Sequence, residues 1–116
     1  MRARQGDVFR AQIAPKIGFG ASRDGTQLVV VAQGNALNSV LETIVAVPLV
    51  PTAPGARALP LDVLVPAAEL GTDRDHLAPV HLLRPIALSR LEPGPVARVS
   101  AATAGRLLAA VRRVFQ

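Results

Sequence analysis

The chain has 116 residues, half of them apolar, and its 13 Lys and Arg against eight Asp and Glu give a formal net charge of +5. This length predicts a single domain, residues 1–116, with an aliphatic core, because only three Phe and no Trp or Tyr are present. The absence of cysteine excludes disulfides and thiolate metal sites, so we expect no metal ion and no cofactor.

The positive charge favours polyanionic partners such as nucleic acid. All but one of the basic residues are Arg, however, so genome composition explains the charge equally simply. The amino terminus lacks the apolar segment of a secretory signal, and no apolar run approaches the roughly 20 residues that span a bilayer. The sequence therefore predicts a soluble cytoplasmic protein.

The first half of the chain predicts three strands. Residues 8–13 alternate apolar and polar side chains, which is typical of a half-exposed strand, and Pro15 ends it. A loop with three glycines follows over 16–26. The runs 27–33 and 42–50 are rich in Val and Ile and are joined by a turn-rich connector. Their near-continuous apolar character indicates central strands that are buried on both faces.

The second half predicts shorter elements. A proline-rich loop over 51–60 leads into a strand over 61–65. Residues 66–71 predict a single helical turn that Gly71 closes. One edge or bulged strand is predicted over 77–86, because its two prolines cannot donate to a ladder, and a short strand over 95–99 follows.

The chain ends in its clearest helix. Ser100 is a good N-cap, and the apolar residues from Leu107 to Phe115 form one stripe. Five or six short strands followed by one helix predict a mainly β fold, a small antiparallel barrel whose opening the helix closes. A barrel this small exposes much apolar surface, which predicts a homodimer.

Short motifs follow one another along the chain in a recognisable order. They are Gly6-Asp7-Val8, Pro15, Gln27–Val31, Asn38, Thr43–Leu49, Gly71, Arg74-Asp75, Leu83-Arg84 and Arg90-Leu91. In this order and spacing they resemble the MazF/PemK family of type II toxin-antitoxin systems, over nearly the whole chain. The resemblance implies an SH3-like barrel, a dimer, and metal-independent cleavage of single-stranded RNA that an acidic antitoxin inhibits.

The sequence departs from the family at the positions that carry the chemistry. The family places an Arg-Pro pair before the second strand, where this chain has Gly25-Thr26, and a Thr at the end of the third strand, where it has Val50. The Ser-Glu-Gln element of the first loop is replaced by residues 19–21. Glycine cannot neutralise a phosphate and valine cannot hydrogen-bond one, so neither role transfers to its own position.

Three other residues are candidates for the catalytic roles. Arg23 has a guanidinium that fits phosphate oxygens, or else it is a solvated loop residue paired with Asp24. Thr52 can supply a hydroxyl or be an ordinary turn residue. His81 falls in the predicted fifth strand and is a candidate general acid or base, or else a strand histidine bonded to a neighbour. His76 is expected at the surface.

RNA binding is assigned to two groups of side chains. Cations and a hydroxyl would contact the sugar-phosphate backbone, and amides in the connector would contact base edges. The residues are Lys16, Ser22, Arg57 and Arg84 for the backbone, and Gln33, Asn35 and Asn38 for the bases. Scattered surface charge and ordinary turn formation are the alternatives.

Two hypotheses follow for the function. The first is a toxin that acts as a metal-independent endoribonuclease on single-stranded RNA and is inhibited by an acidic antitoxin. The second is a catalytically degenerate member of the same family. It would act by binding RNA, an antitoxin or another protein, because one fold supports several functions.

Overall fold

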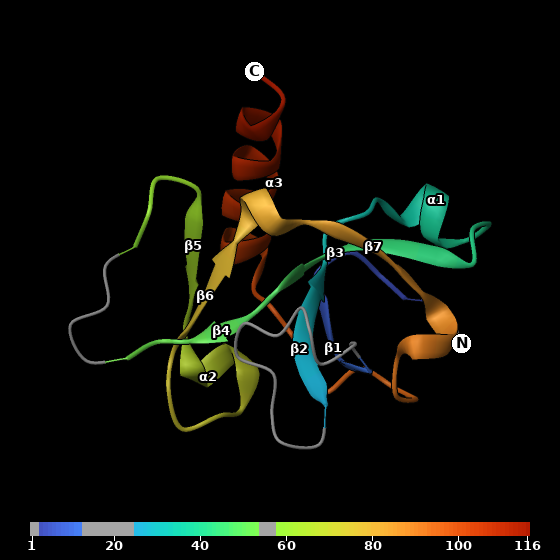
Figure 1. Cartoon of the computed structure of the whole chain (residues 1–116), viewed down its shortest axis with the longest axis horizontal. Helices are drawn as coiled ribbons and strands as arrows, with labels where there is room; N and C mark the ends of the chain where they lie inside the picture. The colour runs from blue at the N-terminus through green and yellow to red at the C-terminus, as the bar shows by residue number, and fades with distance from the viewer. Residues whose placement is uncertain (1–2, 13–24, 54–57) are drawn as a thin grey trace.

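Two antiparallel sheets and a C-terminal helix form the described part of the chain, residues 3–12, 25–53 and 58–116, in this computed structural model (Figure 1). The first sheet contains, in spatial order, β7 (Arg84–Ala87), β3 (Thr43–Pro48), β2 (Thr26–Val31), β1 (Asp7–Gln12) and β8 (Ala97–Arg98). The second contains β4 (Val50–Pro51), β6 (His76–Pro79) and β5 (Asp62–Val65). The helical elements are α1 (Asn35–Asn38), α2 (Ala67–Leu70), η2 (Val80–Leu82), η3 (Leu88–Arg90) and α3 (Ala101–Val114).

The predicted central strands are confirmed. β2 lies between β1 and β3, and side chains that alternate along these strands enter two separate cores. Val8, Val30 and Val47 belong to the core that also includes residues of the second sheet and α3. Phe9 and Val29 belong to a second core on the opposite face of the first sheet. Burial on both faces explains the near-continuous apolar runs.

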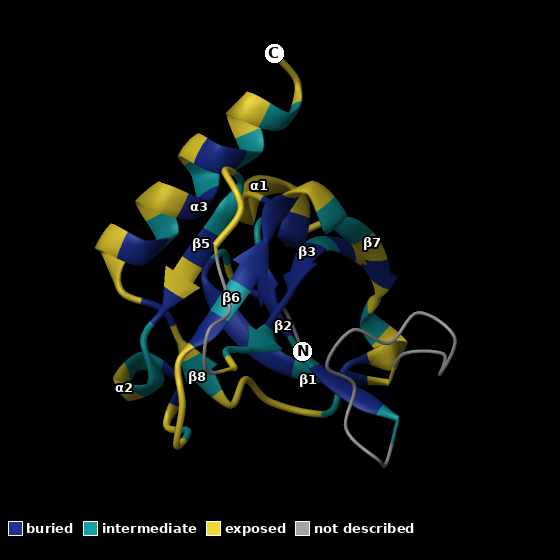
Figure 2. Cartoon of the chain, turned by 60° about the vertical axis from the view of Figure 1, so that its left-hand side comes forward, coloured by how far each residue is buried: buried dark blue, intermediate teal, exposed yellow. Residues whose placement is uncertain are grey.

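The prediction of a half-exposed first strand is confirmed only in part. Phe9 and Ala11 are buried, Arg10 is half-buried and Gln12 is exposed, as the alternation predicts, but Val8, on the same face as Arg10, is buried as well. Val8 packs in the core that contains residues of the second sheet and α3. That core is formed by segments distant in the sequence, which the alternation within β1 alone does not indicate. Figure 2 shows the buried residues concentrated in the strands and on one face of α3.

The prediction of a single strand over 77–86 is also wrong. The chain leaves the second sheet after Pro79, makes the turn η2, and enters the first sheet at Arg84. The Leu83 amide donates to the Val80 carbonyl at 3.0 Å and closes this turn. Pro85 lies on the edge strand β7, where its missing N–H costs least.

The two sheets form a strongly curved, mainly β fold in which the described strands do not close into one continuous barrel. Leu49, which is buried, carries the chain from β3 in the first sheet to β4 in the second. Gly71 ends α2 with a φ of 68°, as its predicted role in closing a helical turn requires.

Ser100 is the N-cap of helix α3, as predicted, and its hydroxyl accepts a hydrogen bond from the Thr103 amide at 3.1 Å. Leu107 and Ala110 are buried in the core, but Phe115, predicted to extend the same stripe, lies beyond the helix end and is 75% exposed. Among the described residues, no helix combines the length and apolar character needed to cross a bilayer.

Candidate functional site

A hollow of about 210 Å³ opens on the second sheet. It is lined by Val50, Leu59, Asp62, Leu77, Pro79, His81 and Leu82. Its walls are mainly aliphatic, and Asp62 and His81 are the ionisable residues among those that line it. None of these lining residues is Lys or Arg, so within the described part of the chain the hollow itself contributes no fixed positive charge.

Val50 and His81 meet in this hollow although 31 positions separate them. Val50 pairs with Leu77 in the β4–β6 ladder, and η2 follows β6 directly, which brings His81 back to the same surface. His81 is exposed, as a group that exchanges protons with a substrate must be. It lies on a turn, however, and not in the strand that the sequence predicted.

Thr52 lies near the N-terminal end of β6, whereas His81 follows the C-terminal end of that strand. Its amide and its hydroxyl both donate to the Asp75 carbonyl, at 3.0 and 3.1 Å. Since Pro51 pairs with His76, Thr52 stands opposite Asp75, six residues before His81 along the chain. The structure therefore does not bring Thr52 and His81 together, and the Thr52 hydroxyl holds the loop that precedes β6.

Asp62 is a lining residue that the sequence did not single out. Its Oδ2 accepts a hydrogen bond from the Leu59 amide at 2.8 Å and fixes the turn into β5. Its Oδ1 is shielded from solvent and has no hydrogen-bond partner. A buried carboxylate oxygen without a donor is costly, which makes it a candidate contact for a ligand.

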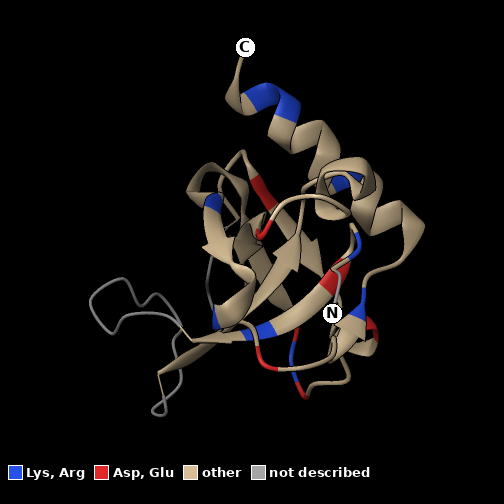
Figure 3. Cartoon of the chain, turned by 90° about the vertical axis from the view of Figure 1, so that its right-hand side faces the viewer, with Lys and Arg blue, Asp and Glu red and all other residues tan. Residues whose placement is uncertain are grey.

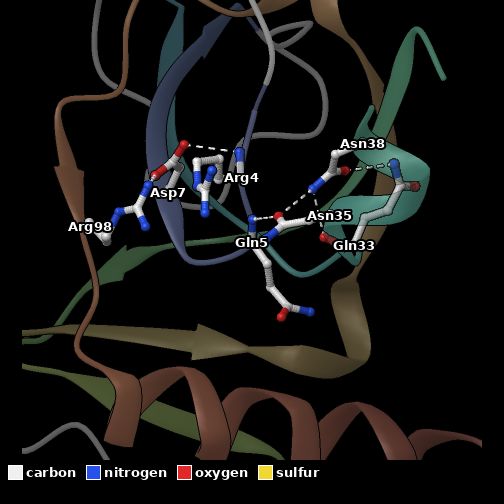
Figure 4. A network of polar contacts seen from close by, with 7 residues as sticks. All are labelled: Arg4, Gln5, Asp7, Gln33, Asn35, Asn38 and Arg98. Atoms are coloured by element: carbon white, nitrogen blue, oxygen red, sulfur yellow. Dashed lines mark hydrogen bonds and ion pairs between the residues drawn. The ribbon is translucent and has the colours of Figure 1, made fainter. Parts of the chain in front are cut away.

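The predicted base-contacting amides do lie together, but they bond mainly to one another and to the backbone (Figure 4). Gln33 and Asn38 are buried, with Gln33 Nε2 donating to Asn38 Oδ1 and Asn38 Nδ2 donating to the Gln33 carbonyl, both at 2.8 Å. Asn35 is exposed, and its Oδ1 accepts from the Gln5 amide at 2.7 Å. This network holds α1 against the N-terminal segment.

The cations are distributed over several elements. Figure 3 shows Arg residues on α3 and on the strands and turns of the sheets. Arg84 is half-buried at the start of β7 and does not line the hollow. The other predicted backbone contacts, Lys16, Ser22 and Arg57, and the catalytic candidate Arg23 lie outside the described residues.

His76 is buried, and its predicted surface position is wrong. Burial lowers the pKa of His76, and the nearby positive charge of Arg74 lowers it further. The Nδ1 of His76 lies 3.1 Å from the Arg74 carbonyl, a contact that partly offsets these two effects. Within residues 3–12, 25–53 and 58–116, no group of His, Asp and Glu side chains is arranged to hold a metal ion.

Comparison with known proteins identifies the family. The family model for PemK-like, MazF-like toxins of type II toxin-antitoxin systems matches residues 4–115. The chain belongs to this family. A comparison with curated proteins found no significant match.

Solved structures of the MazF type share the fold. A mycobacterial endoribonuclease in complex with its cognate antitoxin has a TM-score of 0.77 and 18% identity, and the match covers 97% of this chain and 94% of that one. MazF from Deinococcus radiodurans has a TM-score of 0.75 and 19% identity, with 99% and 97% covered. The Mycobacterium tuberculosis toxin MazF-mt6 has a TM-score of 0.72 and 17% identity, with 94% and 95% covered.

The Gly6-Asp7 pair at the start of this MazF-like chain has a structural role. Gly6 has a φ of 90°, a backbone conformation that favours glycine. The Asp7 carboxylate is buried, accepts from the Arg4 amide at 3.0 Å and forms an ion pair with Arg98 at 2.8 Å (Figure 4). These contacts join the N-terminal segment, β1 and β8.

Gly25 precedes β2 with a φ of 80°. An arginine at this position would be strained, because side chains other than glycine rarely adopt such a φ. The backbone entering β2 is therefore suited to glycine where the family resemblance expects a catalytic Arg. Together with Val50, this is the clearest local departure of the chain from the resemblance.

Proposed function

We propose that this protein is the toxin component of a type II toxin-antitoxin system and acts as a metal-independent endoribonuclease on single-stranded RNA. The hollow lined by Val50 and His81 is the proposed active site. The observation that carries the proposal is the exposed imidazole of His81 on the wall of this hollow, which Val50 also lines. By the sequence resemblance, Val50 takes the place of the family's Thr.

The chemistry proposed is transesterification at a phosphodiester. The 2′-oxygen attacks phosphorus, a new P–O2′ bond forms and the P–O5′ bond breaks, leaving a 2′,3′-cyclic phosphate and a 5′-hydroxyl. A base takes the proton of the 2′-hydroxyl and an acid returns one to the departing 5′-oxygen. His81 is proposed for one of these two proton transfers, since imidazole exchanges protons near neutral pH.

The negative charge that develops on the phosphate requires a cation. We assign this task to Arg23, with Lys16, Ser22, Arg57 and Arg84 as contacts to the RNA backbone. Asn35, the exposed amide, is proposed to contact a base. Asn38 Nδ2 donates to Asn35 Oδ1 at 3.5 Å, and Gln33 Nε2 donates to Asn38, so these two buried amides are proposed to position it. No catalytic role is proposed for Thr52, because its hydroxyl donates a hydrogen bond to the Asp75 carbonyl.

Two protein partners belong to this proposal. An acidic antitoxin would compete with RNA for the cationic residues of a chain with a formal net charge of +5. A second copy of the chain would cover exposed apolar side chains, among them Leu37 and Phe115. The mycobacterial endoribonuclease of similar fold was solved in complex with its cognate antitoxin, which supports the first of these.

A second candidate function is RNA binding without cleavage. Two observations favour it: Val50 offers no hydroxyl to the hollow, and the φ of Gly25 disfavours an arginine at that position. In this case the protein would still bind single-stranded RNA and an antitoxin but would leave the RNA intact.

The test is to incubate the purified protein with a long RNA in EDTA and to map new 2′,3′-cyclic phosphate ends. We expect wild type to cut, and His81→Ala to cut at least about 100-fold more slowly, the lower range for loss of a general acid or base. Ser89→Ala, an exposed residue of the other short turn η3, is the matched control and should keep the wild-type rate. Intact RNA with retained RNA binding would support the second candidate function.

A further inference from the structure

The hollow at Val50 and His81 has a size and lining that point to one kind of ligand group. Its volume of about 210 Å³ is below the roughly 300–1,000 Å³ of pockets that enclose drug-sized molecules. Its walls are aliphatic, from Val50, Leu59 and Leu77 among others. It therefore has room for a single flat ring system rather than for several nucleotides.

The charge of the described lining residues suits an uncharged group better than a phosphate as the group inside. Asp62 is the acidic residue of the wall, and none of the described lining residues is a Lys or Arg that would balance a second anion. An aliphatic wall with one carboxylate instead suits a neutral ring that donates a hydrogen bond. Among the parts of RNA, this describes a nucleobase.

We propose that this hollow receives one unstacked nucleobase with an exocyclic amino group, which donates a hydrogen bond to the Asp62 carboxylate. The unpaired acceptor is Oδ1, which is shielded from solvent and makes no hydrogen bond, so the amino group would reach it by displacing the atoms that cover it, whereas Oδ2 already accepts from the Leu59 amide. A carboxylate that accepts from the N4 amino group of cytosine is an established pairing in nucleic-acid recognition. This inference rests on the proposed binding of single-stranded RNA, whether or not the RNA is then cut.

Cytosine and uracil provide a sharp comparison, because they have the same shape and differ in the groups on one edge. Cytosine presents the N4 amino group, and uracil presents the O4 oxygen at that position. The N3–H donor of uracil lies between two carbonyl oxygens, which a carboxylate repels. The hollow is therefore expected to prefer cytosine over uracil.

Asp62→Asn tests the contact while keeping the local fold. The asparagine side-chain oxygen can still accept from the Leu59 amide, as Asp62 Oδ2 does at 2.8 Å. Its amide nitrogen then stands in place of the free carboxylate oxygen, so an acceptor becomes a donor. Asp73→Asn is the matched control, because it removes one negative charge from an exposed residue that does not line the hollow.

The experiment measures the dissociation constants of short, fluorescent oligocytidine and oligouridine in EDTA at fixed salt concentration, by anisotropy. Both carry 2′-fluoro in place of the 2′-hydroxyl, so that neither can be cleaved. We expect wild type to bind oligocytidine at least about tenfold more tightly than oligouridine, the scale of one hydrogen bond to a charged group. Asp62→Asn should abolish or reverse this preference, and Asp73→Asn should keep it.

Equal affinity of wild type for the two oligonucleotides, or an unchanged preference in Asp62→Asn, would overturn the inference and leave the proposed RNA binding standing. If neither oligonucleotide bound wild type, the proposed binding of single-stranded RNA would itself be overturned, and this inference with it. Circular dichroism of each variant confirms that the fold is kept.

Discussion

His76 and His81 lie five positions apart and have opposite surroundings. His76 is buried where β4, β5 and β6 meet, since it pairs with both Pro51 and Val65, whereas His81 is exposed on η2. Sequence patterns do not distinguish the two correctly. His76 follows a charged turn, which predicts an exposed side chain, and His81 lies in a run that predicts a strand. The difference depends on where the chain leaves the second sheet, which is a tertiary feature.

Burial of His76 predicts a pH-dependent stability. Its pKa in the folded protein is below the usual 6.5, so between the two values the unfolded chain binds a proton that the folded chain does not. The stability from neutral His76 is therefore complete above the usual pKa and is lost as the pH falls through the folded pKa. Urea unfolding across this range should show a free energy of unfolding that decreases toward acid pH, and His76→Gln should flatten that decrease.

His81→Gln is the matched control for the pH series and should retain the wild-type decrease. If His76→Gln and His81→Gln gave the same pH dependence as wild type, the buried histidine would not be its source.

The N-terminal end of helix α3 is stabilised by residues that are both near and distant in the sequence. The Ser100 amide donates to Glu69 Oε1 at 2.8 Å, and the Thr103 hydroxyl donates to Glu69 Oε2 at 3.0 Å. Partial burial tends to raise the pKa of Glu69, but the hydrogen bonds from Ser100 and Thr103 and the charge of Arg106 outweigh it, and the pKa is lowered. The sequence predicted Ser100 as the N-cap but not the contribution of Glu69 from α2.

Ser100→Ala is expected to lower the free energy of unfolding by about 1 kcal/mol, the usual cost of losing an N-cap side chain. Ser89→Ala, which removes an exposed hydroxyl from η3, should change it by much less. Thermal or urea unfolding followed by circular dichroism measures both. Equal stability of the two variants would show that the Ser100 hydroxyl does not contribute as a cap.

The elements that sequence patterns predicted well are those with local causes. The Val-rich runs of β2 and β3, the closure of α2 at Gly71 and the start of α3 at Ser100 follow from residue preferences that act within a few positions. The passage from β6 to β7 was missed, because two prolines weaken a strand without showing that the chain changes sheets. For the same reason the candidate site was only partly predicted: His81 was named, while Asp62, from β5, was not.

At the scale of the whole molecule, an apolar surface remains uncovered near the end of α3. A second hollow of about 290 Å³ is lined by Ala32, Gln33, Gly34, Leu37, Val45, Leu83, Val111 and Phe115. Leu37 is 52% exposed and Phe115 is 75% exposed, and none of the lining residues carries a charge. Depletion of charge is typical of the centre of interfaces between copies of one chain.

The predicted homodimer therefore has a testable surface. Sedimentation velocity should show a dimer for wild type, and Phe115→Asp should raise the dimer dissociation constant at least about tenfold if Phe115 is an anchor of the interface. Val96→Asp is the matched control, since Val96 is 50% exposed and does not line this hollow. A wild-type protein that stays monomeric at every concentration would contradict the dimer.

Single-stranded RNA is proposed to engage the second sheet at the hollow between Val50 and His81. The most direct measurement is the change in backbone amide chemical shifts when 2′-fluoro oligocytidine is added in EDTA. We predict that the largest shifts fall on residues around this hollow, including Asp62, Leu77 and His81. Shifts confined to α3 or to the opposite face of the first sheet, with these residues unchanged, would contradict RNA binding at this hollow.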